Sequence, residues 1–218
     1  MSNSNLKVKP GDIKINNSII NFSFLYPLDF SQLFRIFNEA GYEAVMPILK
    51  DKGFQPFINI VDTEKFRLNY YPEKKLLELI SDSKNISEVF SEIIDTIQLS
   101  DYNILNNLTY CEIVSRTLNI ESEEWKTKLK DINIDFINKF AEIFNFKKLN
   151  VNRIGFTNSL DPLTVNWFGV NILPVNALGE NYYTFEIVYR SDNIDSFRNF
   201  LKSLKDNSDK SIFGDKSG

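Results

Sequence analysis

The sequence contains no histidine. That absence removes the imidazole base and the histidine-ligated metal site, and with them the serine–histidine and cysteine–histidine nucleophiles of many enzymes. The single cysteine, Cys111, excludes an intramolecular disulfide and a zinc site built from several thiolates. The composition therefore argues against most common enzyme classes and fits a reducing compartment.

Long apolar runs and an excess of positive charge are also missing. No apolar run approaches the roughly 18 residues that a membrane-spanning helix needs, and Met1–Lys7 lack the apolar stretch of a signal peptide. We therefore expect a cytoplasmic protein. The net charge of −4 gives no general attraction to nucleic acid or to anionic lipid, so neither is expected as a partner. No glycine-rich phosphate-binding motif occurs, and no cofactor is predicted.

The 218 residues are 43% hydrophobic and 25% charged, which is typical of a globular protein. Alternating apolar and polar residues over 18–25 predict a strand, and a helix is expected between Asp29 and Gly41. Extended runs at 57–61, 66–71 and 75–80 predict an antiparallel meander. A helix capped by Asn85 follows, with apolar residues at helical spacing as far as Ile97.

The same order of elements then repeats. A strand is expected over 109–116, a helix over 122–146, strands over 150–156, 163–172 and 182–190, and a final helix to about Leu204. We predict an α+β fold of two similar strand-helix-three-strand-helix halves, 1–100 and 101–206, followed by a flexible tail over 207–218. The halves would form one curved antiparallel sheet with helices on one face, which resembles in outline the saddle of the TATA-binding-protein fold. That resemblance concerns architecture alone.

Arginines in the predicted strands share one phase. Their side chains are expected opposite the apolar residues, on the face that no helix covers, and this set is Arg67, Arg116, Arg153 and Arg190. Asn69 and Glu186 share the phase, as do Asn21, Asn59 and Glu112. One interpretation is cross-strand pairing with glutamates that keeps an uncovered sheet soluble. The other is a polar surface, the candidate binding site, whose guanidinium groups hold an anionic ligand or an acidic partner.

The sequence gives less support to a catalytic function than to a binding function. Asp62 followed by Glu73 and Lys75 matches the spacing of a carboxylate–metal nuclease, but Glu73 and Lys75 are expected in a turn. Cys111 is expected to be a small buried hydrophobe, and most phenylalanines are expected to fill the core. No catalytic residue and no metal ligand is assigned.

The sequence thus predicts a non-enzymatic binding or assembly protein. A protein partner or self-association into an oligomer is expected, and a small anionic ligand is an alternative occupant of the open face. Two other functions stay open: a sensor module that binds a small molecule between sheet and helices, and a hydrolase that uses carboxylates and a metal ion.

Overall fold

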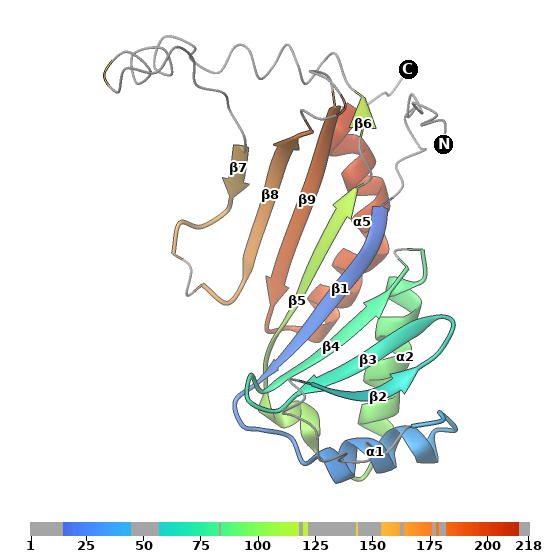
Figure 1. Cartoon of the computed structure of the whole chain (residues 1–218). Coiled ribbons are helices and arrows are strands. Elements are labelled where there is room, and N and C mark those ends of the chain that lie inside the picture. The colour runs from blue at the N-terminus through green and yellow to red at the C-terminus, as the bar shows by residue number, and fades with distance from the viewer. Residues whose placement is uncertain are drawn as a thin grey trace.

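A computed structural model describes residues 15–44, 57–82, 84–117, 120–121, 143, 154–161, 164–175, 178 and 182–213. The predicted helix over 122–146 lies, apart from Ile143, outside these residues, and so does Arg153. The described chain forms a nine-stranded sheet with helices packed on one of its faces (Figure 1).

The described residues form the following strands and helices. In chain order they are β1 (Ile15–Phe24), α1 (Phe30–Glu39), β2 (Ile58–Asp62), β3 (Phe66–Tyr71), β4 (Leu76–Ser81), α2 (Ile86–Leu99), the 3₁₀ helix η1 (Ile104–Asn107), β5 (Leu108–Thr117), β6 (Ile120–Glu121), β7 (Ile154–Thr157), β8 (Trp167–Pro174), β9 (Tyr182–Ser191) and α5 (Ile194–Phe213). Each described strand and helix matches one that the hydrophobic periodicity predicts, apart from the short β6 and η1.

The strands lie in the order β2-β3-β4-β1-β5-β9-β8-β7, and β6 pairs with β9 beyond the end of β5. Every pairing along this path is antiparallel. The predicted α+β class and the antiparallel sheet are therefore confirmed. The division into two duplicated halves and a tail stays a prediction.

The core lies between the sheet and the helices. The Phe22 ring of β1 stacks on Phe90 of α2 with centroids 5.6 Å apart, and Phe90 contacts Phe197 of α5 at 5.1 Å. These three side chains have no exposed surface. On the same side, Phe37 of α1 meets Tyr42, which meets Phe66 of β3. Figure 1 shows α2 and α5 behind the sheet, so within the described residues the opposite face carries no helix.

Helix ends agree with the sequence in part. Asp29 caps α1, because its side chain accepts a hydrogen bond from the Ser31 backbone N–H at 2.8 Å, and Gly41 ends the segment with φ +88°. Asn85 occupies the cap position of α2 but makes no capping hydrogen bond there, so that detail of the prediction is wrong. Helix α5 runs to Phe213 and is longer than expected. No helix among the described residues is long and apolar enough to cross a membrane.

Candidate functional site on the open sheet face

The open face is built by strand pairing. Directly paired residues in antiparallel strands point to the same side of a sheet, so one residue per strand forms a row across it. We call one such row the polar row; it runs through Asn59, Asn69, Glu78, Asn21, Glu112, Arg190 and Trp167 on β2, β3, β4, β1, β5, β9 and β8. The row therefore joins side chains that are up to 169 residues apart in the sequence, from Asn21 to Arg190.

Side-chain contacts hold much of the polar row in place. Asn59 donates to the Asn69 carboxamide oxygen at 3.1 Å, and Arg190 donates from Nε and Nη2 to Glu112 Oε2 at 2.9 and 2.6 Å. The Arg190 guanidinium also lies 4.5 Å from the ring centre of Tyr110. Polar groups fixed by such contacts lose little entropy when they bind a partner.

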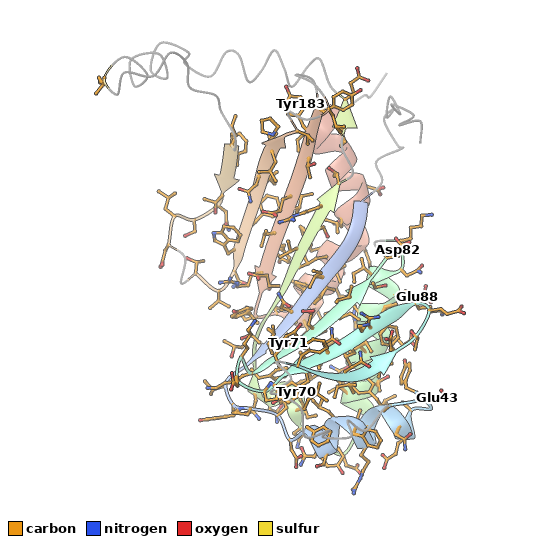
Figure 2. All side chains as sticks on the ribbon, in the orientation of Figure 1. Glu43, Tyr70, Tyr71, Asp82, Glu88 and Tyr183 are labelled. Atoms are coloured by element: carbon orange, nitrogen blue, oxygen red, sulfur yellow. The ribbon has the colours of Figure 1, made fainter. Side chains whose placement is uncertain are left out.

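Glu78, in the middle of the row, accepts from the Tyr71 hydroxyl at 3.0 Å. Burial, together with this hydrogen bond and the charge of Glu78, raises the pKa of Tyr71. The phenol therefore stays protonated and keeps donating well above neutral pH. Figure 2 labels Tyr71 at the end of β3, where Phe57 contacts its ring at 5.5 Å.

A second group of polar residues lies further along β5, β9 and β8. Arg116 of β5 donates to Glu186 Oε2 of β9, with Nε at 2.7 Å and Nη2 at 2.5 Å. Asn171 of β8 donates to the other oxygen, Glu186 Oε1, at 2.9 Å. We call these three residues the β9 cluster. Because Glu186 and Asn171 are buried, the carboxylate depends on these donors for its charge to be tolerated.

Aliphatic side chains lie between the polar row and the β9 cluster. The apolar row, defined by the pairing, consists of Ile80, Ile19, Val114 and Val188 on β4, β1, β5 and β9. Ile19 is 36% exposed, and the other three are partly exposed. At the β4 end this row continues into Arg67, which forms an ion pair with Asp62 at 3.2 Å. The open face thus has an aliphatic centre with charged and amide groups around it, the arrangement found in protein interfaces.

The predicted arginine phase is correct wherever the structure describes it. Arg67, Arg116 and Arg190 all lie on the open face, as do Asn69 and Glu186. Their environments differ: the side chains of Arg67 and Arg116 are 53% and 63% exposed, whereas Arg190 is 23% exposed. Arg153 lies outside the described residues. The expected cross-strand pairing with glutamate is present at Arg116 and Arg190.

Sequence reasoning missed the apolar row, Glu78 and Trp167. The alternation in each strand places Ile19 and Val114 on the open face, but only the register shows that they are neighbours. The signal available in the sequence was the run of apolar residues in both phases of these strands, as in Ile19 beside Ile20 and Ile113 beside Val114.

The carboxylates suggested for metal chemistry do not come together. Asp62 lies opposite Arg67 at one end of β3, whereas Glu73 and Lys75 belong to the turn at the other end of that strand. No group of three or more acidic or cysteine residues that could hold a metal ion occurs in the described part of the chain. Burial raises the pKa of the Cys111 thiol to about 12, so it is protonated at neutral pH.

Comparisons with known proteins add little. No family model and no curated protein matches the chain. Among solved structures, a rolling circle replication initiator protein from Geobacillus stearothermophilus is 12% identical, with 89% of this chain and 80% of that chain covered and a TM-score of 0.31. A similarity of this size supports no conclusion about fold or function.

Proposed function

We propose that this chain is a non-enzymatic binding or assembly protein that docks a protein partner on the open face of its sheet. The observation that carries the proposal is the partly exposed apolar row between the polar row and the β9 cluster. An aliphatic strip on a rigid sheet, with fixed hydrogen-bonding groups beside it, gives a partner both apolar area and directional contacts.

The charges of this face favour a partner with an apolar centre over an anion. Arg67, Arg116 and Arg190 each have a carboxylate within 2.5 to 3.2 Å, so an anionic ligand or an acidic partner would compete with a group already in place. Binding that depended on those arginines would weaken as salt rises, whereas apolar docking would change little. Measuring complex formation at low and high salt separates the two.

The sensor alternative has less support. The layer between sheet and helices, where a small molecule would bind, is occupied by the side chains of Phe22, Phe90 and Phe197.

We also propose that the two halves arose by duplication. The strand order supports this, because outward from the centre of the sheet it runs β1, β4, β3, β2 in one direction and β5, β9, β8, β7 in the other. The cytoplasm stays the expected compartment on sequence grounds.

Photo-crosslinking in cells that produce the full chain tests the proposal. Benzoylphenylalanine replaces Ile19 in one variant and Leu99 in the control, because Leu99 is also an exposed hydrophobic residue but lies at the end of α2, away from the open face. We expect a protein adduct from position 19 that is absent from position 99 and is lost with Val114→Asp. Equal labelling from both positions, or no adduct from position 19, would contradict the proposal.

A further inference from the structure

We infer that the partner is a second copy of this chain, docked open face to open face. The inference rests on the proposed function and names its partner. The two copies would be related by a two-fold axis parallel to the strands that passes between β1 and β5, the central pair of the sheet.

This axis makes the apolar row complementary to itself. Rotation about it reverses the order of the strands, so Ile19 faces Val114 of the other copy and Ile80 faces Val188. Every aliphatic side chain of the row then meets another. Stacked sheets pack about 10 Å apart, a spacing that side chains of this size fill.

The polar row is complementary under the same rotation. Arg190 faces Glu78, and Glu112 faces Asn21. Arg190 uses Nε and Nη2 for Glu112, and among the described residues its Nη1 has no acceptor, so that group can donate to the second copy. Glu78 carries lone pairs beyond those used by the Tyr71 hydroxyl.

A two-fold axis along the polar row is disfavoured by charge. It would place Glu78 against Glu78, Glu112 against Glu112 and Arg190 against Arg190, and juxtaposed like charges are repulsive. An axis along the apolar row would instead place Glu112 against Arg116, Arg190 against Glu186 and Ile80 against Ile80, so crosslinking of Ile80→Cys to itself distinguishes it from the inferred axis.

The area of the face suits a dimer. From β2 to β8 the sheet is about 30 Å wide at the usual strand spacing, and the row of Tyr71 and Tyr110, the polar row, the apolar row and the β9 cluster together cover about 20 to 27 Å along the strands. The product is roughly 600 to 800 Å² per copy, close to the roughly 800 Å² per partner of stable interfaces.

Sedimentation equilibrium over a concentration series tests the inference. The full chain is expected to reach twice its mass of 25.4 kDa. Ile19→Asp should weaken the dimer about a hundredfold or more, because it puts an unpaired carboxylate in the apolar centre, whereas Leu99→Asp should not weaken it. Glu78→Arg, which removes no ion pair to another described residue, should weaken it about tenfold through repulsion from Arg190 and recover in high salt.

The orientation has its own test. Ile80 and Val188 each lie several strands from their own symmetry mates but face one another, so a mixture of Ile80→Cys and Val188→Cys chains should be joined by a short bismaleimide, and neither variant should be joined to itself. Buried Cys111 does not compete for the reagent.

The outcomes separate the inference from the proposed function. A chain that stays monomeric while position 19 crosslinks to a different protein overturns self-docking and keeps the binding role. A dimer unaffected by both Ile19→Asp and Glu78→Arg overturns self-docking on this face. A monomer without any adduct from position 19 overturns both.

Discussion

Glu186 is a buried charged residue on the open face. Its side chain is 12% exposed, whereas that of its partner Arg116 is 63% exposed. If the ion pair is lost, water can solvate the arginine but not the buried carboxylate, so the loss of stability comes from the carboxylate. We predict that Arg116→Gln lowers the free energy of unfolding by about 1–3 kcal/mol, because it removes a charged hydrogen-bond donor from a buried carboxylate.

Arg67→Gln is the matched control for that experiment. Arg67 and Asp62 are both about half exposed, so their pair should contribute less than about 1 kcal/mol. Urea unfolding of both variants gives the comparison. Equal losses for the two would show that Glu186 finds other compensation and that its burial has no energetic consequence.

Cys111 supplies a prediction about pH. Burial raises the pKa of its thiol to about 12 in the folded chain, against about 8.5 for a free cysteine. A raised pKa means that the native state favours the proton, so its contribution to stability is complete below about pH 8.5 and is lost as the pH rises toward 12. At pH 8 we expect Ellman's reagent to modify the thiol in urea but not in the folded protein, and fast labelling of the folded protein would contradict the burial.

At the scale of elements, α2 connects the two parts of the core. Phe90 contacts Phe22 of β1 on one side and Phe197 of α5 on the other, and it has no exposed surface. Phe90→Ala should therefore lower the free energy of unfolding by about 3–5 kcal/mol, a large share of the 5–15 kcal/mol of a typical domain.

The matched comparison for Phe90→Ala is Leu99→Ala on the same helix. Leu99 is 88% exposed, so its truncation should change stability by no more than about 0.5 kcal/mol. Thermal and urea unfolding of both variants measure the difference. A small loss for Phe90→Ala would mean that the ring contacts are not closely packed.

At the scale of the whole molecule, the sheet is continuous across the boundary between the expected halves. β1 pairs with β4 of its own half on one edge and with β5 of the other half on the opposite edge, from Ser18 to Phe24. Separating the halves would expose the β1 edge and the Phe90 surface that Phe197 covers.

We therefore predict that the fragment 1–100 does not fold cooperatively, while the full chain unfolds in one transition. Far-ultraviolet circular dichroism during urea titration measures both. A fragment that keeps a sharp transition at the midpoint of the full chain would show that the first half is an independent domain.

Much of this structure follows from local sequence patterns. The alternation in β1, β5 and β9 and the helical spacing in α2 are local, so they predict the elements, the α+β class and the side of the sheet on which Arg67, Arg116 and Arg190 lie. The end of α5 at Phe213 and the unused cap at Asn85 were not predicted, because helix ends depend on weak local preferences that packing overrides.

The site itself depends on long-range register. Alternation within each strand places Ile19, Glu78 and Arg190 on the same face of the sheet. It does not show that Ile19 pairs with Val114, or that Arg190 lies two strands from Asn21 in one row. Side chains within a strand repeat with a period of two, whereas neighbours across strands are chosen by pairing between distant segments. The sequence by itself therefore determined which residues face outward, and only the tertiary structure decided which of them become one surface.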